Sequence, residues 1–234
     1  TCLDEDYVIP FGDCSHRYRF EYCLVNFLAH EYEEFVSPAP EMLALYEYGD
    51  KRDRFARFIR DFYWTEEVLP AKRKESDSCG SDCSNHGGRF EVFEKSQQYV
   101  RRYNNFVFAA KGGHNSEPHN HNDIGSFMIF ADGQDLLDDL GWSEYDNKYF
   151  TSARYENICA SSLGHSVPII NGKAQLPGLA RKAEAKLSED RISLDISAAY
   201  DEGECIREFV FLPDDSIAIE DSFKGEGLQI TERF

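Results

Sequence analysis

The hydrophobic pattern of this chain changes its period after residue 88, and that change limits the folds it can adopt. Apolar side chains recur every three or four positions in residues 17–34 and again in residues 52–64, which predicts two amphipathic helices. Residues 72–88 form a polar connector that is rich in glycine and serine. Beyond it, apolar and polar side chains alternate in short runs, as in half-buried strands. The sequence therefore predicts a helical beginning followed by a sheet.

The predicted strands follow one another with short turns and with no helical pattern between them. Turn signals such as Ala131-Asp132-Gly133 separate neighbouring strands. This arrangement favours a mainly β protein built as an antiparallel β-sandwich. We expect residues 1–70 to be a short helical segment, residues 71–88 a linker, and residues 89–234 the sandwich, truncated where its last strand reaches the final residue. The predicted strands are residues 90–93, 105–108, 126–130, 191–196, 205–212, 216–223 and 228–234.

Charge and cysteine content restrict the partners and the compartment. The chain carries a formal net charge of -18, whereas binding to nucleic acid needs a basic surface, so we expect no nucleic-acid partner. The sequence has no apolar run of about 18 residues, so it predicts no membrane span. The seven cysteines are odd in number and irregularly spaced, which argues against a disulfide framework and favours a reducing compartment. Cys79, Cys83 and His86 are spaced like half of a zinc knuckle, but no second half follows, which favours a loop.

A group of histidines supplies the first candidate functional residues. Three of the seven histidines lie between residues 114 and 121. In an extended segment, His119 and His121 would point to the same side of the chain, which suits one ring on a metal and one on a substrate. Two histidines in a surface loop are the alternative interpretation.

Two further side chains complete a candidate metal site. Asp139 follows two leucines at a predicted strand end, and His165 precedes a later strand. Two imidazoles and one carboxylate, from His121, Asp139 and His165, form a set of the kind that binds zinc with a fourth position open. A turn cap is the alternative role of Asp139, and Asp138 is the alternative ligand in the neighbouring register.

The segment between His119 and Gln175 resembles a known family. Residues 119–127, HNHNDIGSF, are similar to the HNHxDxGSF signature of the heparinase II/III-like polysaccharide lyases. Asp139-Leu140-Gly141 resembles the D-x-G turn of these lyases, which favours Asp139 over Asp138. Phe11-Gly12-Asp13 resembles a segment late in the α/α-toroid that precedes their sandwich. Further blocks follow in the order of the family: Tyr149-Phe150, Arg154-Tyr155-Glu156, Ser162 to Val167, and Asn171-Gly172 with Gln175.

The resemblance implies a fold and a metal. It implies a β-sandwich of the supersandwich type, in which residues 1–70 are the remnant of an α/α-toroid. It also implies that His121, Asp139 and His165 bind Zn²⁺ and that this ion is mainly structural, because it holds the loops of the sandwich together.

The resemblance implies catalytic residues as well. His119 would lie beside the carboxylate of the substrate and assist proton transfer. Tyr155 would be the catalytic tyrosine, with Tyr149 as its competitor and core packing as the alternative for both. The stretch from Lys148 to Lys186 carries six positive and two negative side chains, which favours the approach of an anionic sugar to this region.

The implied activity is that of a polysaccharide lyase fragment. Such an enzyme cleaves an acidic, uronic-acid-containing polysaccharide or oligosaccharide, glycosaminoglycan or alginate, by β-elimination. Half of the catalytic cleft would lie on the toroid, so we expect this chain alone to be inactive. The alternatives are a non-catalytic carbohydrate-binding sandwich with a structural metal and a metal-dependent glycan hydrolase. The resemblance implies the bacterial cell envelope or periplasm, whereas the unpaired cysteines favour the cytoplasm.

Overall fold

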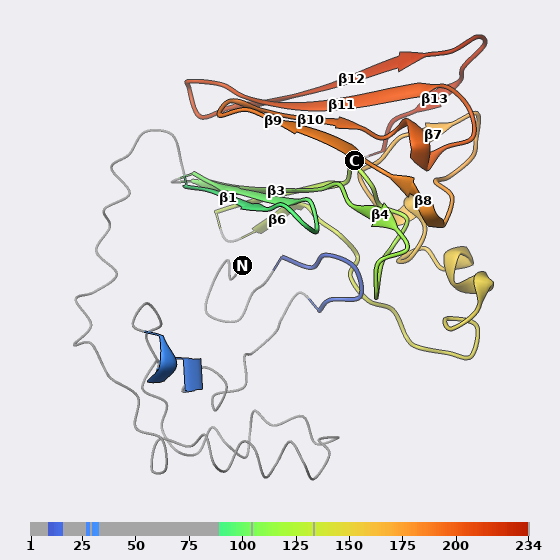
Figure 1. Ribbon diagram of the computed structural model, residues 1–234, viewed down its shortest axis with the longest axis horizontal. Coiled ribbons are helices and arrows are strands. Elements are labelled where there is room, and N and C mark those ends of the chain that lie inside the picture. The colour runs from blue at the N-terminus through green and yellow to red at the C-terminus, as the bar shows by residue number, and fades with distance from the viewer. Residues whose placement is uncertain are drawn as a thin grey trace. The chain divides into compact units, whose positions relative to one another are not determined.

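The computed structural model describes residues 9–15, 27–28, 30–32, 89–103, 105–132 and 134–233 (Figure 1). Contacts divide the chain into two compact units, residues 1–16 with 83–234 and residues 17–82. Within the first predicted helix, residues 27, 28, 30 and 31 are helical. The rest of that helix, the second helix and the linker lie outside the described residues, so the predicted domain boundaries stay a prediction. Among the described residues, no helix is long and apolar enough to cross a membrane.

The first large sheet has five antiparallel strands in the order β1-β2-β3-β5-β6. Sequential hairpins build most of it, and β5 pairs with β3 after a long loop that carries the histidine group. The strands are β1 (Arg89–Phe93), β2 (Gln98–Arg102), β3 (Phe106–Lys111), β5 (Phe127–Ala131) and β6 (Gln134–Leu137).

The second large sheet has four antiparallel strands in the order β12-β11-β10-β9. Two small antiparallel pairs, β13 with β7 and β4 with β8, join segments that are distant in the sequence. The strands are β4 (His114–Asn115), β7 (Ile169–Ile170), β8 (Gly178–Lys182), β9 (Glu184–Leu187), β10 (Arg191–Asp195), β11 (Glu204–Phe211), β12 (Ile217–Lys224) and β13 (Ile230–Thr231). Short 3₁₀ helices are η1 (Ser152–Glu156), η2 (Ser162–Gly164) and η3 (Ser197–Ala199).

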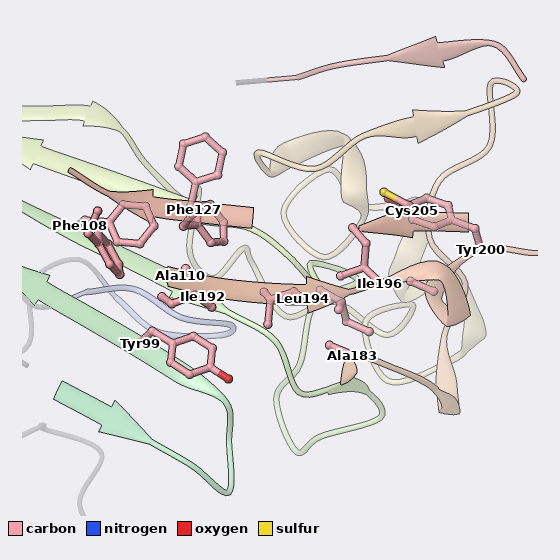
Figure 2. Packing of buried hydrophobic residues seen from close by; sticks show 14 of the residues in the cluster. Tyr99, Phe108, Ala110, Phe127, Ala183, Ile192, Leu194, Ile196, Tyr200 and Cys205 are labelled. Carbon is pink, nitrogen blue, oxygen red and sulfur yellow. The ribbon is translucent and has the colours of Figure 1, made fainter. Parts of the chain in front are cut away.

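The two large sheets pack face to face, as Figure 1 shows for the green and the orange to red strands. The ring of Phe108 in β3 lies 5.0 Å from that of Phe209 and 5.8 Å from that of Phe211 in β11. Phe127 in β5 lies 5.7 Å from Phe209. Each such aromatic pair adds about 0.5–1.5 kcal/mol beyond its buried area. Figure 2 shows this layer, with Phe108 and Phe127 at one end and Tyr200 at the other. The predicted mainly β, antiparallel sandwich is confirmed.

A second apolar cluster covers the outer face of the five-stranded sheet. Val100, Ala109 and Met128 are buried there against Ile9, and Phe11 packs partly buried beside them. The short segment 9–15 therefore belongs with the sandwich. It passes over the outer face of the sheet before it reaches the loop between β4 and β5.

The strands that the sequence did not predict lack a clear alternation, for two different reasons. In β2, Tyr99 faces the inner cluster and Val100 the outer one, so both are 1% exposed and the alternation is lost. The strands β8 and β9 are largely exposed and polar, and buried Ala183 between them carries little signal. Strong alternation identified β11 and β12, and the turn between them has Asp215 at φ 62°, a left-handed conformation.

Candidate metal centre

Four side chains that can bind a metal gather in the loops at one end of the sandwich. His121 and Asp123 lie in the loop between β4 and β5, Asp139 follows β6, and His165 ends η2. All four are buried, and one ligand atom from each lies within 4.8 Å of the others. We call these four residues the His–Asp cluster. It contains the three ligands predicted from the sequence, and it adds Asp123.

The D-x-G turn fixes the orientation of Asp139. Its Oδ1 accepts a hydrogen bond from the backbone N–H of Gly141 at 2.7 Å, and Gly141 has a φ of 65°, which favours glycine. Asp138 has a different task, because its carboxylate accepts the N–H of Asp139 at 2.8 Å. The structure therefore brings Asp139, and not Asp138, into the cluster.

Each histidine of the cluster uses its Nε2 outside the cluster. Nε2 of His165 lies 2.9 Å from the carbonyl oxygen of Cys159, and Nε2 of His121 lies 3.0 Å from Oδ1 of Asp13. Because both partners are acceptors, both Nε2 atoms carry the proton. In the neutral ring, each Nδ1 then carries a lone pair that can bind a cation, and it lies near Asp139, at 3.0 Å for His165 and 3.9 Å for His121.

Lone pairs that face one another are the strongest sign of a cation site. Nδ1 of His121, Nδ1 of His165 and Oδ2 of Asp123 are buried, and none forms a hydrogen bond among the described residues. Each such atom costs about 1–3 kcal/mol when it stays unsatisfied. A divalent cation would satisfy all three at once, and two imidazoles with carboxylates are a donor set that zinc accepts. The residues present therefore fit a metal.

Charges around the cluster adjust its ionisation. Burial alone would lower the pKa of His165, but the carboxylate of Asp139 raises it above the ordinary value. Burial alone would raise the pKa of Asp123, but the charge of Lys111 lowers it, and Nζ of Lys111 lies 2.6 Å from Oδ1. Asp123 therefore divides its two oxygens between a buried lysine and the cluster. Sequence reasoning missed Asp123, although its spacing of two from His121 could have pointed to it.

Asp13 connects the cluster to the exposed face beside it. Its side chain is 1% exposed and accepts from four partners. Oδ1 meets Nε2 of His121 at 3.0 Å and the hydroxyl of Tyr149, Oδ2 meets Nδ1 of His119 at 3.2 Å, and Nη2 of Arg154 lies 3.0 Å from both oxygens. Burial alone would raise the pKa of Asp13, but the hydrogen bonds from His121 and Tyr149 and the charge of Arg154 hold it well below its usual range.

The two predicted catalytic residues lie near one another at this face. The His119 side chain is 74% exposed, and its backbone has a φ of 58°, a left-handed conformation that is rare for histidine. The half-buried Tyr155 lies in η1, and its hydroxyl is 3.4 Å from Oδ1 of Asn120, the neighbour of His119. Tyr149, in contrast, is buried and donates to Asp13. Tyr155 is thus the more exposed of the two tyrosines.

Carboxylates neutralise part of the predicted basic stretch. Lys173 lies 2.5 Å from Glu202, and Arg181 lies 2.8 Å from Asp201. Arg154 is paired with Asp13. Half of the six positive charges are therefore already compensated by residues that lie outside the stretch.

Comparisons with known proteins give the family. The family model described as Heparinase II/III-like, C-terminal, matches residues 85–234. The crystal structure of heparan sulfate lyase HepC from Pedobacter heparinus matches 97% of this chain and 31% of that chain, with a TM-score of 0.54 and 16% identity. The crystal structure of Heparinase III matches 97% of this chain and 32% of that chain, with a TM-score of 0.57 and 14% identity.

This chain therefore spans about a third of the length of these two structures, and at such identities they show the fold alone. A comparison with curated proteins found no match. The model that matches the sandwich covers most of the chain, including all four residues of the His–Asp cluster. The chain therefore belongs to the heparinase II/III-like family, of which it carries the C-terminal domain.

Proposed function

We propose that this chain is the β-sandwich part of a polysaccharide lyase that cleaves uronic-acid-containing polysaccharide by β-elimination. The observation that carries the proposal is the grouping of exposed His119 with Tyr155 and Arg154, directly beside a buried His–Asp cluster, in a domain of this family. The chain supplies one wall of the catalytic cleft, and the remaining residues lie on the part of the parent protein that corresponds to the toroid.

β-Elimination sets clear requirements for these side chains. The C5 proton of a uronate is weakly acidic until hydrogen-bond donors neutralise the adjacent carboxylate. His119 is exposed enough to donate to that carboxylate. Tyr155, once deprotonated, takes the C5 proton, the electron pair forms the C4–C5 double bond, and the C4–O bond breaks. The departing oxygen then takes a proton, from Tyr155 or from His119, and the product carries an unsaturated uronate.

The His–Asp cluster would hold Zn²⁺ in this proposal. His121, Asp139 and His165 are the three ligands, and Asp123 is a fourth donor that also balances Lys111. The ion would join three loops that share no continuous strand, so its contribution is structural. It would also keep His119 in place, because His119 lies two residues from His121.

The substrate of the proposed lyase is an acidic polysaccharide. HepC, which shares the fold, is a heparan sulfate lyase, and this favours a glycosaminoglycan. The site carries donors suited to a carboxylate, namely His119 and Arg154. Arg154 lies 4.6 Å from the ring centre of Tyr149, which restricts its position further.

Ultraviolet absorbance of unsaturated uronate tests the function in the full-length parent. Heparan sulfate, heparin, chondroitin sulfate and alginate should be offered separately, and absorbance should grow with at least one of them. New reducing ends without this absorbance would instead indicate a hydrolase, and sugar retention with neither would indicate a binding module.

Two variants and one control sharpen that test. His119→Ala and Tyr155→Phe should each lower kcat by about 10²–10⁴-fold, the usual contribution of general acid–base catalysis. Tyr103→Phe is the matched control, because the buried Tyr103 hydroxyl forms no hydrogen bond among the described residues, and its kcat should stay unchanged. Wild-type kcat in Tyr155→Phe would remove that residue from the proposal.

A further inference from the structure

The segment that carries Asp13 lies outside the family match, which begins at residue 85, yet it reaches the candidate site. Ile9 and Phe11 pack on the outer face of the five-stranded sheet. The N–H of Asp13 donates to the carbonyl oxygen of His119 at 3.0 Å, and the carbonyl oxygen of Cys14 accepts the N–H of Trp142 at 3.3 Å. Backbone hydrogen bonds on both sides thus hold Asp13 in place.

Gly12 makes this close approach possible. It has a φ of 65°, and a Cβ at this position would lie 2.5 Å from the carbonyl oxygen of His119. A side chain would therefore push the segment away from the histidine loop. The backbone around Asp13 fits against His119 in a way that depends on glycine.

The two oxygens of Asp13 face two different tasks. Oδ1 accepts Nε2–H of His121, whose other nitrogen belongs to the His–Asp cluster. Oδ2 accepts from Nδ1 of His119, whose side chain is exposed to solvent. Arg154 bridges both oxygens through Nη2. The single buried carboxylate of Asp13 therefore contacts both a histidine of the His–Asp cluster and the exposed His119.

We propose that Asp13 is a positioning residue that orients His121 for the metal and His119 with Arg154 for the substrate. Through Oδ1 it selects the tautomer of His121 that leaves Nδ1 free to bind the ion. Through Oδ2 it holds the ring of His119, whose backbone is in an unfavourable left-handed conformation. This inference rests on the proposed function, and it adds a residue outside the matched domain to the same site.

An isosteric substitution removes this role without a change of size. Asparagine offers one acceptor oxygen and one N–H₂ group, whereas Asp13 receives hydrogen bonds from four side chains on two oxygens. In Asp13→Asn, an N–H₂ group would face donors on one side. Outer partners of metal ligands typically contribute about 10–100-fold to metal affinity.

The closing experiment measures zinc affinity, histidine tautomers and kinetics in the full-length parent. Chelator competition should show zinc bound about 10–100-fold more weakly by Asp13→Asn. Nitrogen-15 NMR of the zinc-free protein should show His121 protonated at Nε2 in the wild type and mixed tautomers in the variant. With zinc at saturation, kcat should remain at least tenfold reduced, because His119 and Arg154 stay misplaced. Asp195→Asn, which loses acceptors only within its own turn, should match the wild type in all three measurements.

The outcomes separate this inference from the proposed function. A wild type that binds zinc but shows the same affinity, tautomer and kcat as Asp13→Asn would overturn the inference and leave the lyase intact. A wild type that forms no unsaturated uronate would overturn the proposed lyase activity. The zinc affinity of the protein and the tautomer of His121 would still decide the role of Asp13. A wild type that binds no zinc would overturn the metal site and, with it, the role of Asp13 in orienting His121 for the metal; an unchanged kcat in Asp13→Asn would then overturn the rest of the inference.

Discussion

Two buried polar clusters in the sandwich satisfy their charged atoms in opposite ways. Around the fully buried Arg207, donors meet acceptors: Nε and Nη2 reach the carboxylate of Asp221 at 2.7 and 2.6 Å. Nη1 donates to the carbonyl oxygens of Gly125 and Ser166. In the His–Asp cluster, lone pairs on imidazole and carboxylate face one another. The first cluster is complete within the chain, whereas the second could hold a cation.

The comparison also shows how the two clusters cooperate. Gly125 lies two residues after Asp123, and Ser166 follows His165 directly. Arg207 on β11 thus holds two of the loops that carry the candidate ligands, through hydrogen bonds to their carbonyl groups that involve no metal ligand. Rigid support of this kind is what a preorganised site requires. Arg207 and its acceptors thus hold the loops by contacts within the chain, whereas a metal would satisfy the ligand atoms of the His–Asp cluster.

The largest expected effect belongs to Arg207. Arg207→Met removes a buried cation and leaves the carboxylate of Asp221 and two carbonyl groups without their donor. Breaking a buried pair from one side typically costs about 3–5 kcal/mol of the free energy of unfolding. Chemical denaturation should show this loss with zinc and with chelator alike. A loss that appears only with zinc would contradict the view that this cluster is complete without metal.

Removal of zinc should have the next largest effect. A ligand present at 100 times its Kd stabilises the folded state by about 2.7 kcal/mol, which corresponds to about 5–10 °C in Tm for a chain of this size. Thermal unfolding with zinc and with chelator measures this difference. Removal of zinc should lower the Tm of the full-length parent clearly but should change its affinity for substrate only slightly. The reverse order would show that the metal acts on the substrate and would contradict its structural role.

Much of this arrangement could be predicted from the sequence, because some signals are local. His119, His121, Asp139 and His165 stand in short motifs, and the alternation in β11 reports burial of one face. Strand β2 could not be found in this way, because burial on both faces removes the period of two. Local patterns thus predict what one segment does by itself.

The contacts of Asp13 and Asp123 with remote segments could not be predicted from the sequence. Asp123 was visible within the motif, but its link to Lys111 depends on the pairing of β3 with the histidine loop. Asp13 lies more than 100 residues from its partner His121, and the distance between their side-chain atoms is set by packing on the outer sheet face. The resemblance of Phe11-Gly12-Asp13 marked this segment, but neither that motif nor any period encodes the contact with His121. Polar contacts between remote segments therefore had to come from the structure.

Substitution of a candidate metal ligand should also distinguish the two clusters. In the absence of zinc, it should lower the free energy of unfolding less than Arg207→Met does. His165→Leu removes the unsatisfied Nδ1 and the donor to Cys159. Without zinc the loss should be about 1 kcal/mol, the net value of one hydrogen bond. The stabilisation by zinc should fall close to zero. His114→Leu is the matched control, because His114 lies outside the cluster and should keep the full response to zinc.

The smallest expected effect concerns Tyr149, which donates to Asp13. Tyr149→Phe removes one of the donors to Asp13 and leaves those from His121, His119 and Arg154. We expect a loss of about 1 kcal/mol in stability and a kcat within a few-fold of the wild type, measured by the same absorbance assay. Tyr155→Phe should do the opposite, with little change in stability and a large fall in kcat. If Tyr149→Phe instead abolished kcat while Tyr155→Phe did not, the catalytic hydroxyl would be the buried one, and Asp13 would be its direct partner.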